Sequence, residues 1–87
     1  MRTQLELWQI VKGNFDEYFN FVLFQLIDSL PYGKINHYEK YSLIEELSLY
    51  GDNEIYFLWL SGDAKPRLEF IDKMIRKHSE NAITENK

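Results

Sequence analysis

Cysteine is absent from this sequence of 87 residues, and glycine and proline are scarce, with four and two copies. Without cysteine the chain has no disulfide and no thiolate metal ligand, which fits the reducing conditions of a cytoplasm. The glycines fit turns or helix ends, and none belongs to a phosphate-binding loop. These shortages exclude disulfide-stabilised folds, cysteine-based zinc sites and glycine-rich nucleotide loops.

Long apolar runs are missing as well. The longest mostly apolar segment, residues 18–30, contains Asn20, Gln25 and Asp28 and is too short to cross a bilayer. We therefore expect neither a signal peptide nor membrane association. The net charge is −4, with −5 carried by residues 1–62 and +1 by residues 63–87. An acidic body argues against direct nucleic-acid binding and is compatible with a partner that has a basic surface.

What the chain does contain is enough apolar material for one small globular domain, with 45% apolar and 16% aromatic residues. Capping boxes at Thr3 and Asn36 predict helices over residues 4–12 and 37–50. Residues 15–30 are apolar nearly all round, which predicts a central buried helix that ends at a turn beginning with Pro31.

A last helix is expected after Asp63, because Pro66 then falls in its first turn. Periodicity does not distinguish a short helix from a strand over residues 54–60, and a helix is favoured because a lone strand would have no partner. The sequence therefore predicts an all-α bundle of four to five helices, with residues 1–78 as one domain and residues 79–87 as a frayed tail. The predicted core consists of Trp8, Val11, Phe19, Val22, Leu23, Leu26, Ile44, Leu47, Leu68, Ile71 and Ile75.

Residues with catalytic or metal-binding potential are few. His37 and His78 are expected at a helix start and a helix end, and their spacing matches no metal motif. Adjacent carboxylates such as Glu45 and Glu46 point in different directions on a helix, so they form no acid–base pair. We expect no enzymatic activity, no metal and no cofactor.

The most distinctive cations are Lys65 and Arg67, which lie at a helix start, where positive charge is unfavourable. One explanation is an ion pair with an acid such as Asp63 or Glu54. The alternative is a recognition site in which Arg67, Lys65 and Trp59 bind an anion or a ring beside the turn at Asp63. Separately, Glu45 and Glu46 are expected on the solvent side, as part of an acidic docking surface.

Three segments carry a resemblance to a known family. They are the helix from Glu6 to Val11, the apolar central helix with its turn, and the aromatic run that leads into Gly62-Asp63, Pro66-Arg67 and on to Ile75. Over residues 5–77 the chain resembles small, largely uncharacterised proteins encoded by tailed bacteriophages. The resemblance implies a viral or prophage origin and, by analogy, action in the host bacterial cytoplasm.

The expected function is therefore non-enzymatic binding and inhibition of a host protein, such as a CRISPR effector or another bacterial defence component. Two alternatives stay open, a binder or sponge for a small anionic ligand such as a nucleotide, and an immunity protein that neutralises a basic nuclease toxin. In each protein-binding case the partner is expected to present a basic surface, and a homodimer stays open.

Overall fold

The computed structural model describes residues 2–18, 20–50 and 64–85, and the side chains of residues 81–85 lie outside the description. Every regular element in these ranges is helical, which confirms the predicted all-α class. The elements are α1 (Gln4–Gly13), the 3-10 helix η1 (Phe15–Tyr18), α2 (Leu23–Ser29), α3 (His37–Ser48) and α5 (Ala64–Glu85). Predictions for residues 54–60 and for Asp63 lie outside the described ranges.

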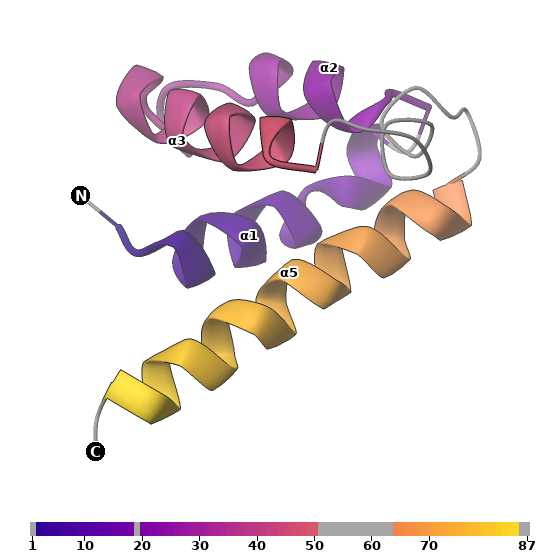
Figure 1. Cartoon of the computed structure of the whole chain (residues 1–87). Coiled ribbons are helices and arrows are strands. Elements are labelled where there is room, and N and C mark those ends of the chain that lie inside the picture. Colours follow the sequence, from indigo (N-terminus) through magenta and orange to yellow (C-terminus); the bar gives the residue numbers. More distant parts are fainter. Residues whose placement is uncertain (1, 19, 51–63, 86–87) are drawn as a thin grey trace.

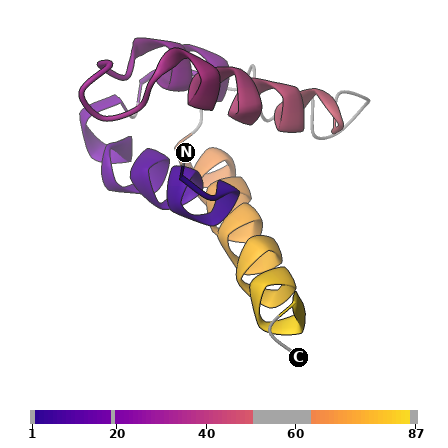
Figure 2. The same cartoon turned by 90° about the vertical axis from the view of Figure 1, so that its left-hand side faces the viewer.

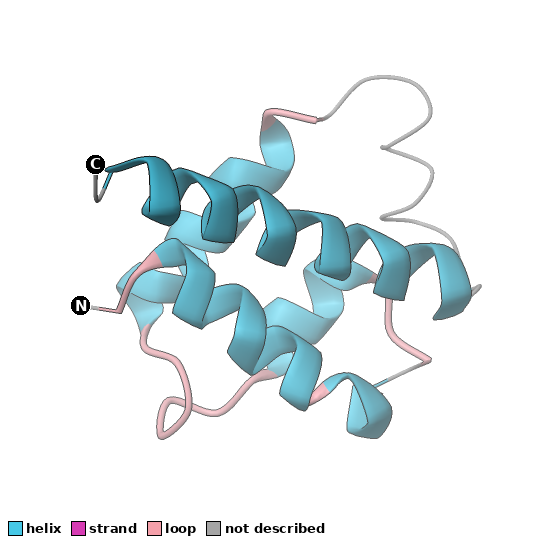
Figure 3. Cartoon of the chain, turned by 90° about the horizontal axis from the view of Figure 1, so that it is seen from below, coloured by secondary structure: helices cyan, strands magenta, loops and turns pink. Residues whose placement is uncertain are grey.

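The helices form two layers. Figure 1 shows α2 and α3 in the upper layer, with α1 and α5 below them. The quarter turn of Figure 2 shows the same separation, and Figure 3 shows α1 and α5 side by side from below. Helices α1 and α5 run in opposite directions. Helix α1 contacts both α3 in the upper layer and α5 beside it.

Local sequence signals explain where α1 and α3 begin. Thr3 accepts a hydrogen bond from the amide of Glu6 at 3.2 Å, and the Glu6 carboxylate accepts from the Thr3 amide at 3.0 Å. Asn36 and Glu39 make the same reciprocal pair at 2.9 and 3.0 Å. Both predicted capping boxes are therefore confirmed, because each satisfies two amides that a helix start leaves without partners.

The predicted central helix over residues 15–30 is wrong in its continuity. The chain forms η1, passes through a turn at Asn20, and starts α2 after Val22, whose backbone is extended at φ −67° and ψ 159°. An unbroken helix would carry apolar side chains on every side, and a chain this short has too few elements to cover them all. The break lets Phe15 and Leu23 face the core separately, while Phe21 and Phe24 stay partly exposed.

The core lies between the two layers. Six predicted core residues are buried, namely Trp8, Val11, Leu23, Leu26, Leu47 and Ile71, and three more, Ile44, Leu68 and Ile75, pack at the edge of the core. Val22 is half-buried, and Phe19 lies outside the described residues. The ring of Phe70 packs edge-on against Trp8, with 6.1 Å between the ring centroids, and joins α5 to α1.

The last helix is longer than predicted. Its backbone is helical to Glu85, through most of the segment expected to form a frayed tail. Residues 79–85 contain neither proline nor glycine, so no local signal ends the helix after His78. Pro66 lies in the first turn of α5, as predicted, where its missing N–H breaks no helical hydrogen bond.

Candidate functional site

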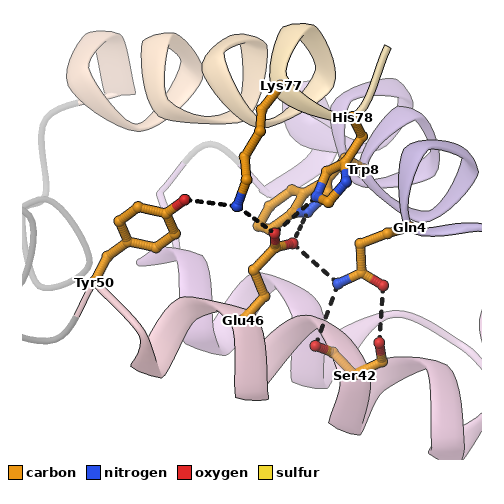
Figure 4. A network of polar contacts seen from close by, with 7 residues as sticks. All are labelled: Gln4, Trp8, Ser42, Glu46, Tyr50, Lys77 and His78. Carbon is orange, nitrogen blue, oxygen red and sulfur yellow. Dashed lines mark hydrogen bonds and ion pairs between the residues drawn. The ribbon is translucent and has the colours of Figure 1, made fainter. Parts of the chain in front are cut away.

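A buried carboxylate joins three helices. Glu46 of α3 is 8% exposed and lies among side chains from α1 and α5 (Figure 4). Its Oε1 accepts hydrogen bonds from Trp8 Nε1 at 2.7 Å and from Gln4 Nε2 at 3.0 Å. Its Oε2 lies 2.7 Å from His78 Nε2 and 3.3 Å from Lys77 Nζ. Each carboxylate oxygen therefore has one partner pair, the first from α1 and the second from α5.

Second contacts hold these partners in place. Gln4 also accepts a hydrogen bond from the Ser42 hydroxyl at 2.8 Å, and its amide nitrogen lies 3.3 Å from the Ser42 carbonyl oxygen. Lys77 donates to the Tyr50 hydroxyl at 2.8 Å, and its ammonium lies 5.3 Å from the centre of the Tyr50 ring. The network is thus anchored at Ser42 in the middle of α3 and at Tyr50, two residues beyond the end of that helix.

The network changes the proton affinity of two of its members. Burial raises the pKa of Glu46, but hydrogen bonds from Trp8, Gln4 and His78, together with the charge of His78, outweigh burial and hold the pKa below its ordinary value. The hydrogen bond to Tyr50 and the contact with Glu46 raise the pKa of Lys77 above its ordinary value. Both groups are therefore stabilised in their charged forms.

This geometry corrects the prediction that Glu45 and Glu46 share a solvent-facing docking surface. Glu45 is exposed, as expected, whereas Glu46 points inward and has its oxygens occupied by four donors. Because its four donors come from two other helices, this carboxylate holds the three helices together. Its oxygens are occupied and leave no open position for a substrate. His78 was expected only as a helix-end residue, and its contact with Glu46 had no local signal because the two residues are 32 positions apart.

The predicted cationic site is likewise rearranged. Arg67 is fully buried, and the centre of its guanidinium group lies 5.8 Å from the centre of the Phe15 ring. A recognition site needs this guanidinium at the surface, so its burial counts against that alternative, while the predicted position of Arg67 beside Trp59 stays a prediction. Lys65 is exposed, while Trp59 and Asp63 lie outside the described residues. Arg67 lies three residues before Phe70 and four before Ile71, so all three side chains are on the same buried side of α5. This spacing could have predicted from the sequence that Arg67 is buried.

A hollow of about 280 Å³ lies at the surface between α2 and α3. Its lining residues are Asp28, Tyr32, His37, Lys40, Tyr41 and Ile44. Lys40 bridges its two sides, because its ammonium donates to the Asp28 carbonyl at 2.7 Å and lies 5.0 Å from the centre of the Tyr32 ring. We call this feature the tyrosine hollow.

Tyrosine side chains dominate the surface around this hollow. Tyr32 is 70% exposed and Tyr41 65% exposed, and neighbouring Tyr38 is 76% exposed. Tyr38 and Tyr41 are three residues apart and both lie off the buried Leu43–Leu47 face, a pattern that could have marked them as surface aromatics.

The described ranges, 2–18, 20–50 and 64–85, hold neither a candidate metal site nor a candidate membrane span. No group of three or more histidine and carboxylate side chains gathers there in a way that could hold a metal ion. None of the helices described combines the length and apolar character that a membrane span requires. Comparison of the chain with known protein families, curated proteins and solved structures finds no match.

Proposed function

We propose that this protein is a non-enzymatic binding protein whose tyrosine hollow docks on another protein. The observation that carries the proposal is the exposure of Tyr32 and Tyr41, which both line the hollow, at 70% and 65%. Tyrosine is enriched at protein interfaces because its ring buries a large area with little loss of side-chain entropy while its hydroxyl forms hydrogen bonds. The hollow, of about 280 Å³, gives a partner side chain a place to insert.

The charge of the chain supports a basic partner. The net charge is −4, and Asp28 and Glu45 are exposed on the two helices that border the hollow. Lys40, the one lysine among the described residues that line the hollow, has its ammonium engaged with a backbone carbonyl and a tyrosine ring. Complementary charge raises the association rate more than it raises the affinity, so we expect binding to slow with added salt.

The resemblance to phage-encoded proteins gives the proposal its specific form. The partner is then a host protein, such as a CRISPR effector or another defence component, and the bound state inhibits it. An immunity protein that neutralises a basic nuclease toxin would use the same chemistry. The anionic-ligand alternative gains no support at Arg67, because a fully buried guanidinium does not present its fork to a ligand in solution.

The test is affinity capture from bacterial lysate with three baits. Wild-type protein and a Gln9→Ala control, altered at an exposed site on α1, should each retain the same stoichiometric partner. Tyr32→Ala should reduce recovery by at least about tenfold, since a central interface tyrosine contributes roughly 1–2 kcal/mol or more. Equal recovery with Tyr32→Ala would remove the hollow from the interface, and a co-purified nucleotide in native mass spectrometry would favour the ligand alternative.

A further inference from the structure

The tyrosine hollow already holds a cation that belongs to the chain itself. Lys40 is half-buried, and its ammonium lies 2.7 Å from the Asp28 carbonyl oxygen and 5.0 Å from the centre of the Tyr32 ring. A carbonyl oxygen and the face of an aromatic ring both attract positive charge. The contacts of Lys40 therefore show which chemistry this part of the surface binds.

The end of α2 explains why a cation is favoured at this place. The last carbonyl groups of a helix lack donors within the helix, and together they carry a partial negative charge. Asp28 belongs to the last turn of α2, and residues 26–29 include no basic side chain that compensates this charge. The side chain of Asp28 adds a formal negative charge to the lining of the hollow. Lys40 supplies the compensating charge from α3.

The size of the hollow suits one more side chain. Its volume is about 280 Å³, and the ring of Tyr41 lines it together with Tyr32. Pockets that bind whole small molecules usually measure about 300–1,000 Å³, so the hollow lies just below that range. A single inserted side chain therefore fits it better than a nucleotide or another ligand of that size.

From these contacts we infer that the tyrosine hollow receives an arginine side chain of the protein partner, and that Lys40 occupies the same place until the partner binds. This inference rests on the proposed docking function and names the group that the hollow recognises. Arginine suits the site better than lysine, because a flat guanidinium stacks on a tyrosine ring and donates to several oxygens at once. Arginine is also enriched among the residues that dominate protein interfaces.

Lys40 acts in this scheme as an internal competitor. When the arginine enters, its guanidinium takes over the contacts with Asp28 and the Tyr32 ring, and the Lys40 ammonium turns to the solvent. The exchange costs little, because the hydrogen bond of Lys40 lies at an exposed position where water replaces it. The formal charges of Asp28 and Lys40 cancel, so removing the lysine charge leaves the hollow negative and strengthens the binding of a cation.

Titration of the purified protein with N-acetylarginine amide, followed by NMR of the tyrosine ring signals, tests the role of Lys40. The probe should shift the signals of Tyr32 and Tyr41 in a saturable way. It should bind Lys40→Met at least about threefold more tightly than wild type, since the internal competitor is gone. Lys73→Met makes the same change at an exposed position of α5 and should bind like wild type. Unshifted tyrosine signals in Lys40→Met, or equal affinities of Lys40→Met and wild type, overturn the inference.

Two further comparisons test whether charge is what the hollow recognises. N-acetylcitrulline amide has nearly the shape of the arginine probe without its charge and should bind at least about threefold more weakly. Asp28→Asn keeps the backbone carbonyl and should weaken binding of the arginine probe by a similar factor, whereas Asp16→Asn, at an exposed position of η1, should not. A neutral probe that binds as well as the charged one, or two asparagine variants that bind alike, also overturns the inference.

The outcomes separate this inference from the docking proposal. If the probe does not bind while capture of a partner still depends on Tyr32, the hollow docks without receiving an arginine and the inference is wrong. If the probe binds while capture is the same with Tyr32→Ala, the docking proposal is wrong although the hollow recognises a guanidinium group.

Discussion

Among the described residues three charged side chains are buried, Glu39, Glu46 and Arg67, and the last two are stabilised in different ways. Glu46 has four hydrogen-bond partners from two helices, so its charge stays compensated away from water. Arg67 is fully buried on the first turns of α5, where its guanidinium faces the Phe15 ring. Its long side chain fills interior volume, so replacing it removes packing as well as charge.

Arg67→Ala should lower the free energy of unfolding by roughly 2–4 kcal/mol, because it leaves a cavity beside Phe15. Arg67→Lys should recover only part of this loss, since an ammonium cannot reproduce the flat stacking of a guanidinium on a ring. The measurement is urea unfolding at neutral pH. Arg76→Ala, a matched arginine at an exposed position of the same helix, should change stability by about 0.5 kcal/mol or less. Similar values for the two alanine variants would contradict a packing role for Arg67.

At the scale of elements, the helix starts follow from local hydrogen bonding and the helix lengths do not. Capping boxes fix the starts of α1 and α3 because each is completed within four consecutive residues. The break between η1 and α2 depends on which apolar faces find cover in the folded chain, whereas α5 continues to Glu85 because no proline or glycine ends it after His78. The apolar composition of residues 15–30 therefore predicted one helix where the chain forms η1 and α2. The polar composition of residues 79–87 predicted an end for α5 that is earlier than the observed one.

Asn36→Ala removes one cap and should lower stability by about 1 kcal/mol, because the Glu39 amide loses its acceptor. For a domain of this size that corresponds to a fall of roughly 4–8 °C in Tm. Asn36→Ser restores a capping oxygen and should recover most of the loss in thermal unfolding. If the serine variant unfolds as early as the alanine variant, the side chain of Asn36 acts by something other than capping.

At the scale of the whole molecule, the Glu46 network connects the two layers. Its members come from α1, α3 and α5, so it is formed only when these three helices are packed together (Figure 4). The folded protein lowers the pKa of Glu46, which means that the folded state prefers the ionised carboxylate more than the unfolded state does. The resulting stabilisation is present above the ordinary pKa of 4.5 and is lost as the pH falls toward the lower folded value.

Stability should therefore decline as the pH falls below 4.5, and Glu46→Gln should make that decline shallower. At neutral pH the same variant should be less stable by about 1–3 kcal/mol. Its NH2 group would face the N–H groups of Lys77 and His78, and hydrogen-bond donors that face each other cannot bond. Urea midpoints measured between neutral and acidic pH test both statements, with the exposed Glu45→Gln as the matched control. Because the pKa values of Glu6 and Glu39 are also lowered, part of the decline remains in the variant. Parallel curves for wild type and Glu46→Gln would exclude Glu46 as a source of the acid sensitivity.

The sequence by itself determined the helical class, the two capping boxes, the turn after Pro31 and part of the core. Each of these depends on residues within a few positions of one another, where hydrogen bonding and periodicity act directly. Only the tertiary structure decided that Glu46 and Arg67 point inward and that the tyrosines of α3 point outward. The partners Trp8 and His78 are 38 and 32 residues from Glu46 along the chain. A local pattern shows that a helix has several faces, but which face is buried depends on the helices that pack against it, and those come from distant parts of the sequence.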